Sequence, residues 1–246
     1  MLGKLIVFEG GEGCGKTTQV QRLHGWLDRS EALKLLRTQN AVSGIKLTRE
    51  PGGTEVGTKI RQLLLTAQSS GEAPLLSKTE LLLYAADRAQ HVEETLRPWI
   101  EEGYWVLCDR FTDSTVAYQG YGRQLDLSLI NTLNKIATGG LQSDLTLWIN
   151  ASPEVGLSRM RQRGQADRIE QAGLAFHQRV NEGFSALANP ATHAKTSSGT
   201  TEQLPASSGP TVEIDGNRSI EEVSAQIQQV IQARLSQWYP QLTDLV

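Results

Sequence analysis

The chain has 246 residues, of which 39% are hydrophobic and 21% charged, and its formal net charge is −3. These values predict one globular domain, residues 1–246, with one large core. Because the chain has no overall basic field, we expect no nucleic-acid partner and only local anion binding. No apolar run approaches the roughly 18 residues that a membrane span needs, so we expect no membrane insertion. The two cysteines, Cys14 and Cys108, are expected to be reduced thiols in a cytoplasmic protein.

Short apolar runs alternate with longer amphipathic segments along the chain, which is typical of a parallel sheet with crossover helices. The pattern predicts strands near residues 4–9, 45–48, 105–109, 145–150 and 212–215. It predicts helices near residues 16–29, 55–66, 78–102, 128–138, 153–164 and 170–188, and a last helix that runs to Trp238. Ser219 and Glu222 form an S-x-x-E capping box where that last helix begins.

Two stretches are expected to be surface excursions from this α/β pattern. Residues 30–44 lengthen the path from the first helix to the second strand. Residues 189–210 are rich in Ser, Thr, Gly and Pro, a composition that predicts a flexible insertion.

The motif G-x-x-x-x-G-K-[ST] follows the first predicted strand and opens the first helix, as a phosphate-binding loop requires. We expect Lys16 to reach the β and γ phosphates of a nucleotide and the Thr17 hydroxyl to bind Mg²⁺. The backbone N–H groups and the helix dipole would hold the phosphates. The expected nucleotide-binding residues are Gly10, Gly11, Glu12, Gly13, Cys14, Gly15, Lys16, Thr17 and Thr18.

The expected nucleotide is ATP rather than GTP. Guanine-specific switch proteins carry N-K-x-D, whereas residues 134–137 read NKIA and lack the aspartate. The D-x-x-G motif of such proteins is also missing from the sequence.

Three polar clusters stand at or near the ends of predicted strands, where open α/β sheets bind ligands. They read TREPGGT at 48–54, LLLYAADR at 81–88 and DRFTDSTVAYQG at 109–120. Taken singly, each arginine is more often a solvated charge and each tyrosine more often core packing. Their convergence around one phosphate loop favours a binding site for a second substrate. The candidate residues are Arg49, Tyr84, Arg88, Asp109, Arg110, Tyr118 and Gln119.

These motifs, together with RxRxRG and DRIE at 159–170, resemble the thymidylate kinase family, which phosphorylates dTMP with ATP. The resemblance covers nearly the whole chain in order. It implies a P-loop kinase fold with five parallel strands, helices on both faces, a mobile lid at about 158–170, the use of Mg²⁺, and a homodimer. The two excursions and Phe111, where the family often has Tyr or His, depart from the family pattern.

Glu12 places a carboxylate inside a phosphate-binding loop, where it would repel the ligand unless a cation intervenes. The resemblance implies that Glu12 instead accepts a hydrogen bond from the 3′-hydroxyl of the acceptor deoxyribose. The alternatives are that Glu12 points to solvent or pairs with an arginine such as Arg49.

The resemblance also implies roles for the remaining candidates. Tyr84 would stack on or flank thymine, Arg88 would hydrogen-bond the base, and Gln119 or Thr115 would contact its polar edge. Arg49 and Arg110 would hold the monophosphate, and Asp109 would organise the water around Mg²⁺.

Position 13 is Gly where some relatives place an arginine, so we expect the lid to supply the missing positive charge. On a helix Arg159 and Arg163 share one face, while Arg161 projects roughly 200° away from Arg159. We therefore predict Arg159 and Arg163 as arginine fingers, with Gly164 as a hinge. Lys16, Arg110 and Glu12 complete the expected catalytic set.

Two other functions remain open on the sequence alone. One is another P-loop small-molecule kinase, for a deoxynucleoside or a different monophosphate. The other is a nucleotide-dependent regulator with a vestigial acceptor pocket. Phosphorylation of a panel of nucleosides and monophosphates separates the three.

Overall fold

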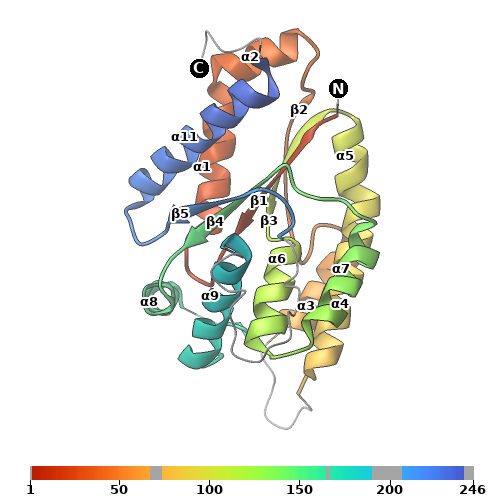
Figure 1. Ribbon diagram of the computed structural model, residues 1–246, viewed down its shortest axis with the longest axis vertical. Helices are drawn as coiled ribbons and strands as arrows, with labels where there is room; N and C mark the ends of the chain where they lie inside the picture. The colour runs from red at the N-terminus through yellow and green to blue at the C-terminus, as the bar shows by residue number, and fades with distance from the viewer. Residues whose placement is uncertain (1, 67–73, 165–166, 190–206, 241–246) are drawn as a thin grey trace.

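The computed structural model describes residues 2–66, 74–164, 167–189 and 207–240 of the chain. Five parallel strands form one sheet in the order β2-β3-β1-β4-β5. Their bounds are Lys4–Glu9, Gly44–Arg49, Tyr104–Asp109, Leu145–Asn150 and Thr211–Asp215 for β1 to β5. All five predicted strands are therefore confirmed, and the fold class is the expected α/β architecture (Figure 1).

The position of each strand in the sheet follows from its apolar content. β1, β3 and β4 read KLIVFE, YWVLCD and LTLWIN, and nearly every residue in them is buried. Continuous apolar runs of this kind are typical of parallel strands that are covered on both faces. β2 and β5 read GIKLTR and TVEID, include exposed residues, and lie at the two edges.

One face of the sheet is covered by α1 (Lys16–Arg29), α2 (Glu31–Thr38) and α11 (Ile220–Trp238), as Figure 1 shows. Ile6 and Phe8 of β1 point to this face and pack in one cluster with Leu23 and Ile227. The predicted capping box begins α11, because the Ser219 hydroxyl accepts from the Glu222 N–H.

The opposite face carries Leu5 and Val7 of β1, which pack with Val92 and Leu96. This alternation follows from the two-residue period of a strand.

The segment predicted as one helix at 78–102 is α4 (Ser77–His91), a π-helical turn (Val92–Leu96) and α5 (Arg97–Glu101). The other helices within the described ranges are α3 (Glu55–Leu65), α6 (Thr112–Thr115), a π-helical segment (Val116–Gly122), α7 (Leu127–Thr138), α8 (Pro153–Arg163) and α9 (Leu174–Ala188).

The expectation that residues 30–44 are a surface excursion is wrong. Ser30 caps α2 by accepting from the Leu33 N–H, and Leu33 and Leu36 are buried in the same cluster as α1. The apolar residues of α2 lie on one helical face, so the segment forms part of the core.

The expected flexible insertion at 189–210 is only partly within the described residues, because 190–206 lie outside them. Where the chain is described again, its first residues contact α6. Ser207 Oγ donates to Asp113 Oδ2 at 2.7 Å, and the Ser208 N–H donates to Asp113 Oδ1 at 2.8 Å. The end of the insertion is therefore fastened to α6, beside the sheet.

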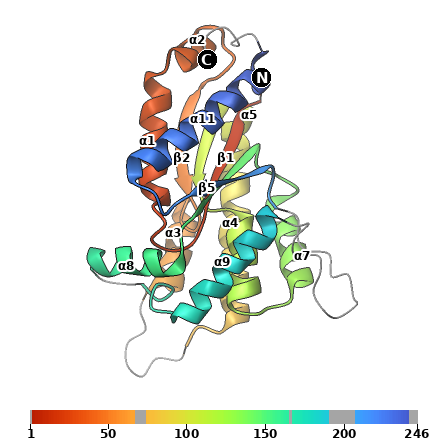
Figure 2. The same cartoon turned by 60° about the vertical axis from the view of Figure 1, so that its left-hand side comes forward.

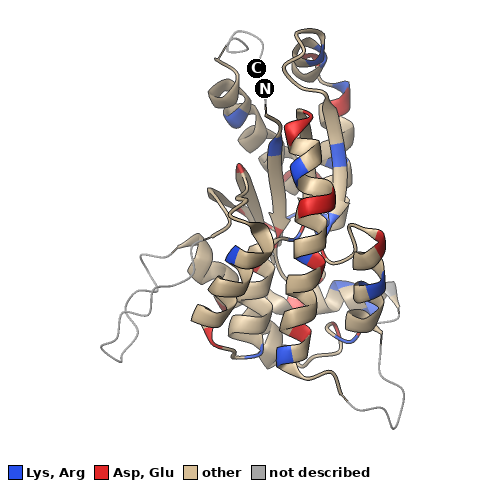
Figure 3. Cartoon of the chain, turned by 90° about the vertical axis from the view of Figure 1, so that its right-hand side faces the viewer, with Lys and Arg blue, Asp and Glu red and all other residues tan. Residues whose placement is uncertain are grey.

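Charged residues of both signs are interspersed along the helices that face the viewer in Figure 3. No helix among the described residues is long and apolar enough to cross a membrane.

Candidate active site

The phosphate loop connects β1 to α1 with the backbone that its glycines permit. Gly10, Gly13 and Gly15 have φ of 143°, 68° and 96°, values that favour glycine. Lys16 is buried and folds back over the loop, where its Nζ donates to the Gly10 and Gly11 carbonyl oxygens at 2.9 and 2.8 Å. The predicted strand, loop and helix are thus in the arrangement that phosphate binding requires.

Gly13 lies against Gly156 of α8. In Figure 2 this helix lies at the left of the molecule. A Cβ at Gly13 would lie 2.2 Å from the Gly156 carbonyl oxygen, and a Cβ at Gly156 would lie 2.3 Å from the Glu12 carbonyl oxygen. A side chain at position 13 therefore has no room, so packing against α8 accounts for the glycine at this position.

Thr17 and Asp109 meet at the end of β3, where Thr17 Oγ1 donates to Asp109 Oδ2 at 2.9 Å. The second carboxylate oxygen, Asp109 Oδ1, is buried and has no hydrogen-bond partner among the described residues. A hydroxyl and an unpaired carboxylate oxygen are the donors that Mg²⁺ prefers. The two predicted metal-site residues are therefore together and fit a magnesium ion with its waters.

Glu12 is paired with an arginine, but not with Arg49. Arg110 Nη2 donates to Glu12 Oε1 at 2.5 Å, and the Tyr118 hydroxyl donates to the same oxygen at 2.8 Å. Burial alone would raise the pKa of the Glu12 carboxyl, but the charges of Arg110 and Lys16 and the Tyr118 hydrogen bond lower it to about 2. Glu12 is thus held as a carboxylate, and it does not point to open solvent.

Arg110 is held by contacts on several sides. Its Nη1 donates to the Gly10 carbonyl oxygen at 3.0 Å and to Ser114 Oγ at 3.1 Å, while its Nη2 also donates to the Tyr118 hydroxyl at 3.1 Å. Arg110 adopts φ of 74°, which is uncommon outside glycine and occurs often at functional sites. This backbone conformation directs the guanidinium toward the phosphate loop.

Glu9, the last residue of β1, supports this arrangement from inside the core. Its carboxylate accepts from the Phe111 N–H at 2.8 Å, the Ser114 N–H at 3.1 Å and Ser114 Oγ at 2.6 Å. Burial, and then the charge of Asp113, raise the pKa of the Glu9 carboxyl to about 7. Glu9 therefore fixes the hydroxyl that Arg110 contacts.

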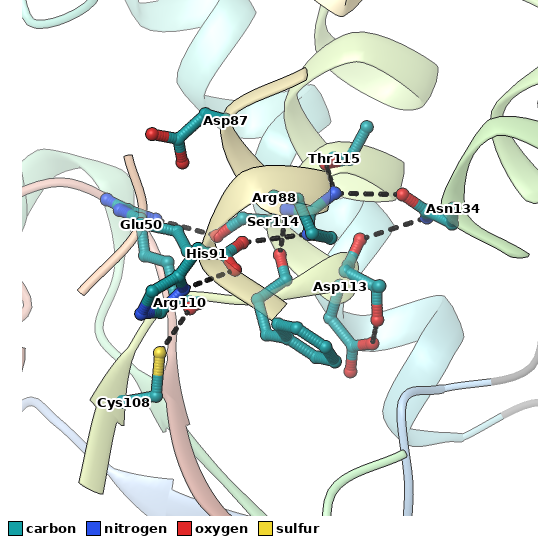
Figure 4. A network of polar contacts seen from close by, with 12 residues as sticks. Glu50, Asp87, Arg88, His91, Cys108, Arg110, Asp113, Ser114, Thr115 and Asn134 are labelled. Carbon is teal, nitrogen blue, oxygen red and sulfur yellow. Dashed lines mark hydrogen bonds and ion pairs between the residues drawn. The ribbon is translucent and has the colours of Figure 1, made fainter. Parts of the chain in front are cut away.

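Arg88 lies at the centre of the buried polar network shown in Figure 4. Its Nε donates to Glu50 Oε2 at 2.8 Å. Its two terminal nitrogens donate to Thr115 Oγ1, Asn134 Oδ1 and the Phe111 carbonyl oxygen at 2.8 to 2.9 Å. Four of the five guanidinium N–H groups are consequently used within the protein.

Glu50 connects this network to β2 and its following turn. Its second carboxylate oxygen lies 2.9 Å from His91 Nδ1, and His91 Nε2 lies 2.7 Å from Thr48 Oγ1. Burial would raise the pKa of the Glu50 carboxyl, but Arg88 and His91 hold it below its ordinary value. The turn that follows Arg49 is thus anchored to α4.

A second buried carboxylate, that of Glu80 on α4, accepts hydrogen bonds from residues on the other side of the site. It accepts from Gln119 Nε2 at 2.8 Å, from both Nε and Nη2 of Arg123, and from Arg168 Nη2 at 2.6 Å. Arg168 Nε also donates to the Leu64 carbonyl oxygen at 2.8 Å. These contacts join Arg168, near the end of the expected lid, to α3 and α4.

Two adjoining cavities lie at this end of the sheet. The larger, with a volume of about 530 Å³, is lined by the phosphate loop and by Thr17, Arg49 and Asp109. The smaller is lined by Tyr84, Arg88, Thr115, Tyr118 and Gln119. The residues that line both cavities are Glu12, Glu50, Arg61, Arg110 and Asp167.

The arrangement matches what comparison with known proteins finds. The family model for thymidylate kinase matches residues 8–227. The chain belongs to the thymidylate kinase family. Its relatives named thymidylate kinase include those of Cyanothece sp. (strain PCC 7425 / ATCC 29141), 51% identical over the whole of both chains, and of Acaryochloris marina (strain MBIC 11017), 47% identical over 98% of this chain and all of the relative. A third, of Trichodesmium erythraeum (strain IMS101), is 47% identical over 97% of this chain and 99% of the relative.

The resemblance to the thymidylate kinase family is therefore confirmed. Residues of the phosphate loop and of the three polar clusters at 48–54, 81–88 and 109–120 line the two adjoining cavities. Their individual roles stay predictions. The expected lid arginines are not gathered at the phosphate loop among the described contacts: Arg159 Nη1 donates to the Gly216 carbonyl oxygen at 3.0 Å, and Arg161 is exposed. The side chain of Arg163 lies outside the described part of the chain.

Sequence reasoning missed several residues at this thymidylate kinase site, among them Glu80 on α4. Glu9 ends β1 just before the phosphate motif, and Glu50 stands inside the TREPGGT motif directly after β2. A charged residue next to a buried strand end was the available signal for both. Arg61 stands in the amphipathic pattern of α3, where an arginine reads as a solvated charge.

Proposed function

We propose that this protein transfers the γ-phosphoryl group of ATP to dTMP and yields dTDP. The main support for this proposal is that Glu12 and Arg110 line both the phosphate-loop cavity and the cavity of Tyr84 and Gln119. Donor and acceptor would therefore meet where these residues stand. In-line transfer between two anions needs alignment and charge neutralisation more than covalent help, and this site supplies fixed cations.

On the donor side, Lys16 would exchange its bonds to the Gly10 and Gly11 carbonyl oxygens for phosphate oxygens. Thr17 and the unpaired oxygen of Asp109 would hold Mg²⁺, directly or through water. When bound, Mg²⁺ neutralises charge on the donor phosphates. The N–H groups at the start of α1 would complete the phosphate site.

On the acceptor side, Glu12 would accept from the 3′-hydroxyl, since Arg110 and Tyr118 hold it ionised and in place. Tyr84 would flank thymine. Arg88 has one N–H left after its four internal bonds, and that group would serve the base. Gln119 donates its amide to Glu80, so its carbonyl oxygen or Thr115 would meet the polar edge of the base.

Closure of residues 158–170 would bring lid arginines to the transferring phosphoryl group and exclude water. Arg159 would then leave the Gly216 carbonyl oxygen. Arg163 would act beside it.

We also propose a cytoplasmic homodimer. Three apolar side chains, Leu63 of α3, Leu82 of α4 and Ile136 of α7, are between 57% and 71% exposed on neighbouring helices. A second copy of the chain would cover them. Light scattering of the purified protein tests the dimer, and Ile136→Glu should shift it toward monomer.

The function is tested by coupling ADP formation to the addition of each acceptor in a panel. Rapid turnover with dTMP, and little with AMP, CMP, UMP or thymidine, is the expected result. Equal turnover with the other monophosphates would instead favour a broader kinase. ATP binding without transfer to any acceptor would favour a regulator.

A further inference from the structure

Arg61 lies on α3 at the boundary of the two cavities and is half-buried. Its Nη1 donates to the Pro51 carbonyl oxygen at 2.9 Å, which fixes the guanidinium against the turn after β2. Its Cδ would lie only 3.0 Å from a Cβ at Gly52, so the glycine lets the side chain pass close to the backbone. The long side chain is thereby directed from α3 toward the site.

The donors of Arg61 are much less used than those of its neighbours. Arg88 donates hydrogen bonds from four of its N–H groups to protein oxygens. Arg110 likewise makes four contacts with protein oxygens. Arg61 makes a single hydrogen bond and no ion pair among the described residues. Four N–H groups of a fixed guanidinium therefore remain available where donor and acceptor would meet.

Arg61 lies near another cation, Arg49, and near one carboxylate, Asp167. Burial, and then the neighbouring charge of Arg49, lower the pKa of the Arg61 guanidinium. Arg49 itself has no ion pair among the described residues, and Arg110 is neutralised by Glu12. A phosphate between Arg49 and Arg61 would relieve this repulsion and satisfy a guanidinium fork, which matches phosphate oxygens well.

We propose that Arg61 binds the phosphate of the acceptor nucleotide. This inference rests on the proposed dTMP kinase function and adds a residue that the motifs did not reveal. Arg61 and Arg49 would donate hydrogen bonds to the monophosphate. Arg110 would contact both the monophosphate and Glu12.

The test compares dTMP with thymidine, which has the same base and sugar but no phosphate. Calorimetric dissociation constants for both ligands are measured with the wild-type protein and with Arg61→Ala and Arg61→Gln. We expect each variant to bind dTMP about 10- to 100-fold more weakly, as for a lost hydrogen-bonded charge. Thymidine affinity should change less than about twofold, because thymidine has no group for the guanidinium.

Lys59→Ala is the matched control, because Lys59 is an exposed cation of the same helix that pairs with Glu55. It should leave both affinities unchanged. Equal losses for dTMP and thymidine in both Arg61 variants would show that Arg61 only supports the Pro51 turn, and no loss would show no contact with phosphate. Either result would overturn the proposal. A wild-type protein that binds dTMP no better than thymidine would instead overturn the proposed function.

Discussion

Arg110 and Glu12 form an ion pair with an Nη2–Oε1 distance of 2.5 Å, although 98 positions separate them in the chain. The pair explains how a carboxylate is tolerated in a phosphate-binding loop, because the guanidinium neutralises it before any phosphate arrives. It also leaves the second Glu12 oxygen for a ligand donor.

Glu12 should distinguish dTMP from its 3′-deoxy analogue. If Glu12 accepts from the 3′-hydroxyl, the analogue should lose about 1–3 kcal/mol of binding or transition-state free energy, as expected for a charged group left unpaired. Glu12→Gln should shrink that difference, whereas Tyr118→Phe should preserve it, since Arg110 still holds the carboxylate. Steady-state kinetics with both acceptors provide the measurement. If the wild type phosphorylated both acceptors with the same kinetic constants, the contact between Glu12 and the 3′-hydroxyl would be contradicted.

The lid arginines should differ in their effects on rate. Arg163→Ala should lower kcat by about 10²-fold and change dTMP binding little, because a finger acts mainly in the transition state. Arg161 is exposed, so Arg161→Ala should be milder and serves as the control. Single-turnover rates for Arg159, Arg161 and Arg163 variants decide the order. Dominance of Arg161 would contradict the assigned helix face, and three near-normal variants would exclude the lid from the chemistry.

Glu9 should make stability depend on pH. Its carboxyl pKa rises from an ordinary 4.5 to about 7 on folding, so the folded state retains a proton that the unfolded chain has lost between these values. The stabilising contribution is therefore complete below about pH 4.5 and is lost as pH rises through 7, with a loss on the order of 3 kcal/mol.

Glu9→Gln has no such proton to lose. Its free energy of unfolding should therefore rise relative to the wild type between pH 5 and pH 8, which urea titrations at several pH values measure. Glu101→Gln changes an exposed residue and should show no such trend. A difference between Glu9→Gln and wild type that stays constant over this range would contradict the assignment.

Arg88 should matter for stability apart from any contact with a base. Arg88→Met leaves the buried Glu50 carboxylate without its ion-pair partner, so unfolding free energy should fall by about 3–5 kcal/mol. Adding Glu50→Gln should recover part of the loss, and Arg29→Met, at an exposed position, should cost little. Chemical denaturation of the wild type, Arg88→Met, Glu50→Gln, the double variant and Arg29→Met tests this. Additive effects of the two buried substitutions would argue against the network.

The sequence alone determined the parts of this protein that local patterns encode. The apolar run KLIVFE followed directly by a glycine-rich GKT turn and an amphipathic helix predicts strand, phosphate loop and helix, because each signal acts over a few neighbouring residues. The same holds for the capping box at Ser219. The order of the polar motifs along the chain indicated the family.

The tertiary structure decided which of those motif residues hold one another. The left-handed backbone of Arg110 and its packing against Ser114 direct it to Glu12, and no local pattern encodes either. From the sequence, Arg61 would be interpreted as a surface charge. In the structure it donates to the turn at Pro51, which lies against α3. The sequence of α2 was interpreted as a surface excursion. In the structure Leu33 and Leu36 pack in the core with α1 and the sheet. Such pairings depend on side-chain directions and on contacts between distant segments, which arise only when the helices pack on the sheet.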